Sequence, residues 1–126
     1  MNKKQRERRK LLFRNKVGKK HFDRRKNAVL HHGDDWKHFL LKAELGFLLR
    51  DAGHEFGSEL EFPNGRTCDV FDLETFIVYE LESGLDDAAR GKKLEDFGGF
   101  GFVEDVIVLD VGGLELGEGL ERELVL

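Results

Sequence analysis

The spacing of apolar residues along this 126-residue chain changes from helical to extended and back. Between residues 34 and 53 the spacing predicts a helix that begins at Asp34 or Asp35 and ends at Gly53. Its apolar, core-facing stripe is expected to contain Trp36, Leu40, Ala43, Phe47 and Leu48. Glu44 falls within that stripe, where a carboxylate must be paired or bound to a metal, unless it lies at the edge and reaches water.

Three strands are predicted between residues 55 and 82. The first covers about 55–62 and the second about 66–71, joined by Pro63-Asn64-Gly65-Arg66, where Asn-Gly supplies the positive φ angles of a hairpin turn. Residues 72–75 form the next turn. The third strand, about 76–81, is apolar on both faces and is therefore expected in the centre of the sheet.

A second helix is predicted over about 86–97, with Ser83 or Asp86 as its cap, followed by a glycine-rich loop and a fourth strand at 106–109. A strand, a helix and a strand in succession predict that the third and fourth strands are parallel. The final LERELVL segment indicates a last short helix. The predicted fold is therefore an α/β domain, an α-β-β-β-α-β core with a mixed central sheet flanked by helices.

Composition is typical of one folded domain, with 40% hydrophobic and 37% charged residues. No apolar run is long enough to span a bilayer, and the basic N-terminus has no apolar signal region behind it. These features predict an intracellular, cytoplasmic protein that does not enter a membrane. Cys68 is the only cysteine, which excludes an internal disulfide and a multi-cysteine zinc site, and it is expected to face the core.

Charge divides the chain into a basic arm, residues 1–30, and an acidic domain, residues 31–126. Residues 1–26 contain 13 basic and two acidic residues, a formal charge of +11, whereas the remainder has 8 basic and 23 acidic residues, a charge of −15. A basic arm of this kind favours a nucleic-acid partner, with DNA preferred over RNA, although a solvated tail is the simpler alternative. The residues expected to contact phosphates are Lys3, Lys4, Arg6, Arg8, Arg9, Lys10, Arg14, Lys16, Lys19, Lys20, Arg24, Arg25, Lys26 and, in the hairpin turn, Arg66.

Three acids are predicted to meet at one end of the sheet. Glu80 and Glu82 share a face of the third strand because side chains alternate, and Asp69 on the second strand lies opposite Glu80 if the two strands form a hairpin. Neighbouring carboxylates repel one another, and a divalent cation would remove that repulsion. Oxygen-only ligands favour magnesium, manganese or calcium over zinc. Exposed strand-end acids in an acid-rich domain are the alternative.

These residues in this order of elements resemble the PD-(D/E)XK nuclease superfamily, whose fold is called restriction-endonuclease-like. The matching segments are TCDVF with Asp69, YELES with Glu80 and Glu82, KKLEDF, and DVIVLD, and the resemblance extends over about residues 34–111. The first helix of that family often contributes a glutamate to the metal site, and Glu44 matches it. One departure is that Glu82 stands where the family usually has a lysine.

The resemblance implies an Mg²⁺-dependent endodeoxyribonuclease, with Mn²⁺ as a substitute, acting as a homodimer and selecting DNA structures such as junctions. Asp69, Glu80 and the Leu81 carbonyl would hold the metal, with Glu44 bound through water. Glu82, Lys92 or Lys93 would orient or deprotonate the attacking water.

The sequence is also compatible with two other functions. The first is a catalytically inactive protein of the same fold that binds nucleic acid or acts in assembly, which the glutamate at position 82 favours. The second is an interaction module whose basic arm binds an acidic protein or the acidic face of its own domain.

Overall fold

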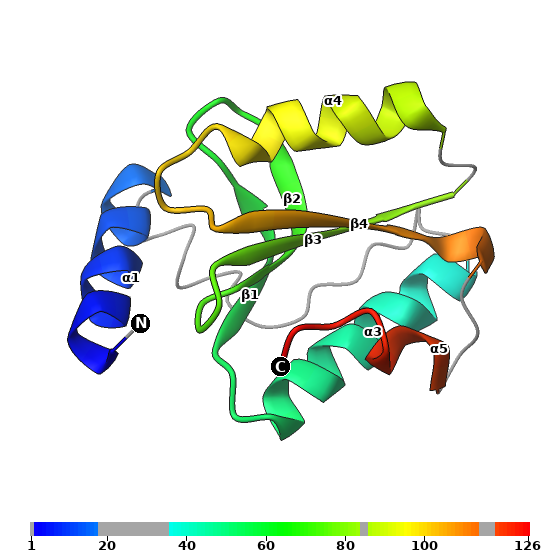
Figure 1. The fold of residues 1–126 in the computed structure, drawn as a ribbon, viewed down its shortest axis with the longest axis horizontal. Coiled ribbons are helices and arrows are strands. Elements are labelled where there is room, and N and C mark those ends of the chain that lie inside the picture. Colours follow the sequence, from blue (N-terminus) through cyan, green and yellow to red (C-terminus); the bar gives the residue numbers. More distant parts are fainter. Residues whose placement is uncertain (1, 18–35, 84–85, 114–117) are drawn as a thin grey trace.

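The computed structural model describes residues 2–17, 36–83, 86–113 and 118–126, with the backbone alone at 12–17 and 118. The chain forms an α/β domain in which helices flank one four-stranded sheet (Figure 1). The elements in order are α1 (Lys3–Val17), α3 (Trp36–Asp51), β1 (Phe56–Glu61), β2 (Thr67–Asp72), β3 (Ile77–Glu82), α4 (Asp87–Gly98), β4 (Asp105–Asp110), the 3₁₀ turn η1 (Val111–Gly113) and α5 (Glu118–Glu121).

The sheet has the order β1-β2-β3-β4. The first three strands form an antiparallel meander, with Phe71 opposite Gly57 of β1 and Val78 of β3. β3 and β4 are parallel along six residues, from the Ile77↔Asp105 pair onward, because α4 carries the chain back across the sheet. The predicted parallel pair and the predicted mixed sheet are both confirmed.

Local signals in the sequence fix most of the element ends. Gly53, with φ 81°, ends α3, and the His54 N–H then donates to the Leu49 carbonyl. Gly65, with φ 82°, allows the β1–β2 turn, but Asn64 does not adopt the positive φ expected of it; its side chain instead accepts from the Arg66 N–H. The Asp86 side chain accepts from the Ala89 N–H and caps α4. The predicted caps at Asp34 and Asp35 lie outside the described residues.

The face of α3 that packs on the sheet differs from the expected one. The buried stripe contains Leu41, Leu45 and Leu49, spaced by four residues, which pack with the strand residues and with Leu120 of α5. Most of the predicted stripe faces solvent instead: the side chains of Trp36, Leu40 and Phe47 are 69%, 42% and 65% exposed, whereas Leu48 is partly buried against the cluster. The prediction was wrong because this helix is apolar on two sides, and its periodicity fits either side equally well.

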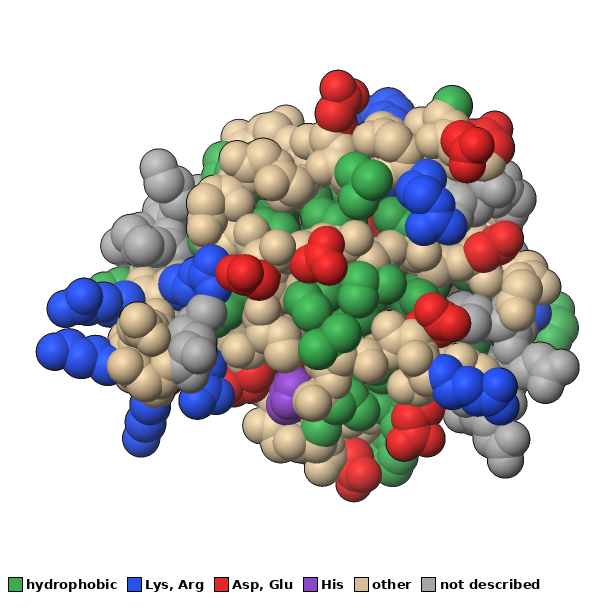
Figure 2. Space-filling model, viewed as in Figure 1, with side chains coloured by type: hydrophobic (Ala, Val, Ile, Leu, Met, Phe, Trp, Pro, Cys, Tyr) green, Lys and Arg blue, Asp and Glu red, His purple; other side chains and the backbone are tan. Residues whose placement is uncertain are grey.

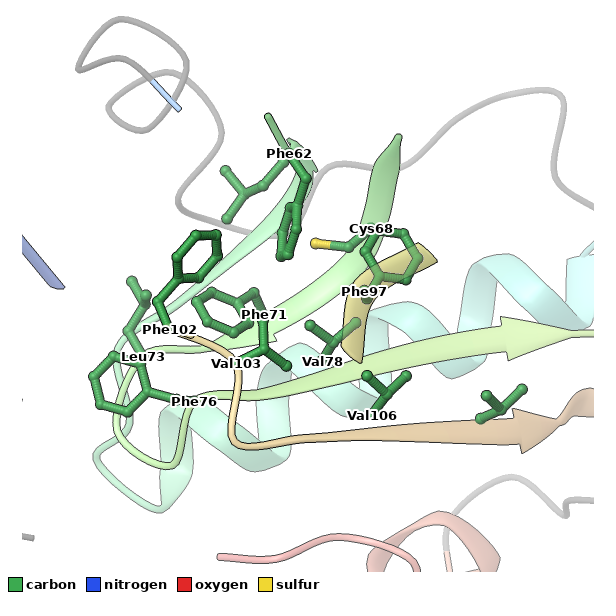
Figure 3. Close-up of a cluster of buried hydrophobic side chains, with 12 residues drawn as sticks. Phe62, Cys68, Phe71, Leu73, Phe76, Val78, Phe97, Phe102, Val103 and Val106 are labelled. Carbon is green, nitrogen blue, oxygen red and sulfur yellow. The ribbon is translucent and has the colours of Figure 1, made fainter. Parts of the chain in front are cut away.

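The other face of the sheet is covered by α4 and the loop that follows it (Figures 1 and 3). Phe62 lies at the centre of this layer, with its ring centroid 5.1 Å from that of Phe97 and 5.8 Å from that of Phe71, both in edge-to-face geometry. Cys68 is fully buried in the same cluster, as predicted. Among the described residues, no helix combines the length and the apolar composition that a membrane span requires.

Candidate functional site

The candidate site lies where the regular alternation of side chains along β1 and β2 is interrupted. Cys68 packs in the cluster beneath α4 and Val70 in the cluster beneath α3, although residues two apart in a regular strand share a face. Asp69 lies between them, and its neighbour across the sheet is Glu59, which adopts φ 53° in the left-handed region. The side chains therefore change from one face of the sheet to the other at this point. The Asp69 side chain is directed along the sheet toward β3, where it accepts from the Leu81 N–H.

At one end of the β2–β3 pair, the side chains of Asp69 and Glu80 accept the hydrogen bonds that backbone carbonyls accept elsewhere in the sheet. One position beyond the Val70↔Tyr79 pair, Glu80 Oε2 accepts a hydrogen bond from the Asp69 N–H at 2.6 Å. In return, Asp69 Oδ2 accepts from the Leu81 N–H at 2.7 Å. Each carboxylate thus satisfies an amide of the opposite strand, which brings two acids together at the end of the hairpin, as the sequence predicted.

Lys93 of α4 completes the group. Its Nζ lies 3.1 Å from Glu80 Oε1 and 2.9 Å from Glu82 Oε1, so the ammonium bridges both acids of β3. The expectation that Glu80 and Glu82 share a face is therefore confirmed. Lys92, one residue earlier, pairs instead with Asp96 on its own helix, at 3.6 Å. Of the two lysines considered from the sequence, only Lys93 lies at the acids.

Burial and mutual repulsion shape the protonation of this group. Burial first, and the Asp69 charge second, raise the pKa of Glu80 to about 8, against the opposing charge of Lys93. Burial also raises the pKa of Asp69, although the Leu81 hydrogen bond and the Lys42 charge oppose it. Burial alone would lower the pKa of Lys93, but the charges and hydrogen bonds of Glu80 and Glu82 raise it. Lys93 is therefore a fixed positive charge and not a base.

A second ion pair, between Lys42 of α3 and Glu59 of β1, is buried next to the site. Lys42 is 1% exposed, and its Nζ lies 2.6 Å from Glu59 Oε1, beside the irregular position in β1. His38, one turn earlier, places Nε2 3.0 Å from the Leu81 carbonyl. That oxygen only accepts, so Nε2 carries the proton. Sequence reasoning missed all three residues; the available signal was a lysine three residues before Leu45, at helical spacing from that apolar residue.

The expected metal ligands are only partly assembled. Asp69 and Glu80 meet, but the Leu81 carbonyl contacts His38 Nε2, and it is the Leu81 N–H that donates to Asp69. Glu44 is half-buried on a flank of α3, and the α3 groups whose charges act on Asp69 are Lys42 and His38. In the described part of the chain, no three histidine, cysteine or acidic side chains gather as a metal-binding group.

An open cleft of about 420 Å³ lies between the β1–β2 turn and α4. Arg66, Lys92 and Lys93 line it together with Thr67 and Phe97, and Asp96 is its one acidic lining residue. Asn64 Nδ2 donates to the Asp96 carbonyl and holds the turn against α4. The cleft is thus cationic in a domain that is strongly acidic, and Lys93 is shared between it and the acid pair.

The first part of the basic arm forms helix α1 (Lys3–Val17), which packs against the acidic domain. Arg6 contacts Glu74 at 2.6 Å, Arg9 contacts Glu104 at 2.9 Å, and Lys10 reaches Glu55 and Glu74 at 3.0 and 3.1 Å. Lys3, Lys4 and Arg8 are exposed, as Figure 2 shows for the basic side chains that project from α1. The other expected phosphate contacts in the arm lie outside the described residues or side chains: Arg14, Lys16, Lys19, Lys20, Arg24, Arg25 and Lys26.

Comparison with models of protein families, with curated proteins and with solved structures gave no match.

Proposed function

We propose that this protein is a metal-dependent phosphodiesterase that cleaves nucleic acid, with DNA as the preferred substrate and two copies of the chain acting on a duplex. The observation that carries the proposal is the meeting of two buried carboxylates, Asp69 and Glu80, with the Lys93 ammonium at one end of the sheet. Buried groups with raised pKa values beside a specific charge partner cluster at functional sites.

The arrangement of elements supports the same proposal. The α-β-β-β-α-β order, the antiparallel meander and the parallel β3–β4 pair agree with the restriction-endonuclease-like fold that the sequence resembles. Asp69 and Glu80 then occupy the two acidic positions of the PD-(D/E)XK motif. Lys93, supplied from the following helix, takes the place of the lysine that Glu82 replaces.

The two carboxylates are chemically suited to Mg²⁺ or Mn²⁺. Their raised pKa values reflect an environment in which a second negative charge is unfavourable, and a divalent cation would relieve it. Mg²⁺ is commonly held by one or two carboxylates and keeps several waters, so Asp69, Glu80 and the Leu81 carbonyl suffice as protein ligands. When bound, the ion would polarise the phosphate and lower the pKa of a water.

The cationic cleft supports a route for the substrate. A phosphodiester entering between Arg66 and Lys92 would reach Lys93 and, beyond it, Glu80. Lys93 remains protonated, so it would stabilise the negative charge that develops on the phosphate during hydrolysis. Glu82, whose carboxylate is a third exposed, is the acid of the group that is placed to orient the attacking water.

One observation favours a second function, nucleic-acid binding without cleavage. The Lys93 ammonium already bridges Glu80 and Glu82, so a fixed positive charge balances these acids in the absence of a metal. A chain of this kind would keep the cleft and lose the chemistry.

A cleavage assay separates these functions. Wild type, Asp69→Asn, Glu80→Gln and Lys93→Gln are incubated with supercoiled plasmid, single-stranded DNA, a four-way junction and RNA, in Mg²⁺, Mn²⁺ or EDTA. Lys92→Gln is the matched control, because it removes the same charge from the same helix and cleft without touching the acids. We expect metal-dependent cutting that is lost in Asp69→Asn, Glu80→Gln and Lys93→Gln and only weakened in Lys92→Gln, because Lys92 lines the cleft but does not contact Glu80 or Glu82.

Binding of DNA by a wild type that never cuts would select the second function. Cutting that persists in both acid variants would refute the assignment of Asp69 and Glu80.

A further inference from the structure

Helix α1 has two basic faces with different roles in the structure. A residue advances by about 100° around an α-helix, so Arg6, Arg9 and Lys10 share one side, Lys4 and Arg8 lie on the opposite side, and Lys3 lies at the border next to Lys10. The first set points to the domain and the second to solvent. The sequence shows only a run of like charges and does not reveal which of them face the domain.

The inner face is held by charge and by an aromatic contact. Its three cations meet Glu55, Glu74 and Glu104, and the Arg9 guanidinium lies 4.8 Å from the centre of the Phe76 ring. Burial alone would lower the pKa of Lys10, but hydrogen bonds to Glu55 and Glu74 raise it. Hydrogen bonds from Arg6 and Lys10 lower the pKa of Glu74 although its burial acts the other way. The inner charges therefore neutralise each other.

The outer face keeps its positive charge. Lys3, Lys4 and Arg8 are exposed, and none of them makes an ion pair with a residue that the structure describes. Glu7, the one acid in this helix, lies 3.6 Å from Lys10. Docking of α1 thus converts an acidic end of the sheet into a basic surface (Figures 1 and 2).

We propose that this docked helix is a binding surface for the phosphate backbone of a nucleic acid, with Lys4 and Arg8 as its contacts and Arg6, Arg9 and Lys10 as its anchor. A polyanion is the complementary partner because the surface is cationic and lies on a domain that is otherwise acidic. An anionic membrane fits less well, since Lys3 to Lys10 contains no apolar residue and Leu11 is the one exposed apolar side chain that the structure describes on α1. The inference does not depend on cleavage.

The test compares two pairs of substitutions that change the net charge equally. Full-length wild type, Lys4→Gln/Arg8→Gln and Arg6→Gln/Arg9→Gln are titrated with a fluorescein-labelled 20-base-pair DNA duplex in EDTA, by anisotropy, between 50 and 200 mM salt. Each phosphate contact contributes about 0.9 to the slope of log affinity against log salt. Loss of two contacts lowers the slope by about 1.8, so the outer variant loses about twelve-fold less affinity than wild type over this range.

We expect the outer variant to show this smaller slope with an unchanged melting temperature. The inner variant should keep the wild-type slope and melt at a lower temperature, because it loses two anchoring ion pairs. Equal slopes in the two variants would mean that the arm acts only through its total charge, and would overturn the proposal. Failure of wild type to bind the duplex at 50 mM salt, or binding of phosphatidylserine vesicles in its place, would also overturn it.

Discussion

Glu80 gives a pH dependence of stability whose sign is unusual for a carboxylate. Its pKa is about 8 in the folded chain and 4.5 when solvated, so between these values the folded state binds the additional proton. The free energy of unfolding therefore falls as the pH rises from 4.5 to 8. Most buried acids with ion-pair partners act in the opposite direction. Glu80→Gln removes the ionisation while keeping the shape of the side chain, and it should flatten this decline, leaving the smaller part that the raised pKa of Asp69 contributes.

The size of the effect follows from the pKa difference. A gap of 3.5 pKa units corresponds to at most about 5 kcal/mol at pH 8, at about 1.36 kcal/mol for each unit. The glutamine amide also meets two donors, the Asp69 N–H and the Lys93 ammonium, and it can accept from only one with its oxygen. That conflict costs about 1–3 kcal/mol at every pH. The slope against pH, and not the stability at one pH, is therefore the quantity to compare.

The assay is urea denaturation in EDTA at intervals from pH 5 to 8.5, followed by circular dichroism. Glu82→Gln is the control, because Glu82 contacts the same lysine but is a third exposed, where water screens its charge. We expect a falling curve for wild type and for the control, and a flatter curve for Glu80→Gln. Parallel curves for wild type and Glu80→Gln would refute the reasoning about the buried acid pair.

Addition of Mg²⁺ or Mn²⁺ at pH 8 extends the same experiment. A metal held by Asp69 and Glu80 would stabilise wild type by about 2.7 kcal/mol at 100 times its dissociation constant. The stabilisation should disappear in Glu80→Gln. Equal stabilisation of both proteins would place the metal elsewhere.

Three further predictions concern other parts of the chain. Lys42→Met removes the cation that faces the buried Glu59 carboxylate and should lower the free energy of unfolding by about 3–5 kcal/mol. Adding Glu59→Leu should recover most of this loss. Additive losses in a double-mutant cycle would contradict the pairing. The fluorescence of Trp36, the only tryptophan, should peak at the long wavelengths of a solvated indole and should be quenched readily by acrylamide. A blue-shifted emission that acrylamide quenches poorly would show that this face of α3 is covered in solution. Burial raises the pKa of the Cys68 thiol well above its usual range, so it should react with Ellman's reagent only in denaturant, and rapid labelling of the native chain would be inconsistent with its position.

The acid pair was predictable because two local rules agree. Alternation along a strand places Glu80 and Glu82 on one face, and the length of the turn after Asp72 places Asp69 opposite Glu80. Each rule depends only on neighbours in the sequence. The choice between Lys92 and Lys93 was not predictable, because adjacent helical residues point about 100° apart, and the rotation of α4 over the sheet decides which one reaches the acids.

The buried face of α3 shows where periodicity fails. Both sides of this helix are apolar, and only the packing of Leu41, Leu45 and Leu49 against the sheet selects between them. The same selection buries Lys42 and leads it to Glu59, a contact between residues 17 positions apart with no local signature.

By itself, the sequence determined the order of the elements from α3 to α5, the turns and caps that separate them, the parallel β3–β4 pair and the nearness of Asp69 to Glu80. These follow from the conformational preferences of glycine, asparagine and aspartate and from the strict periods of helices and strands. The tertiary structure alone decided which helix face is buried, which lysine meets the acids, and which cations of the basic arm are anchored on the domain. Those outcomes depend on how elements rotate and pack on one another, which short-range periodicity does not specify.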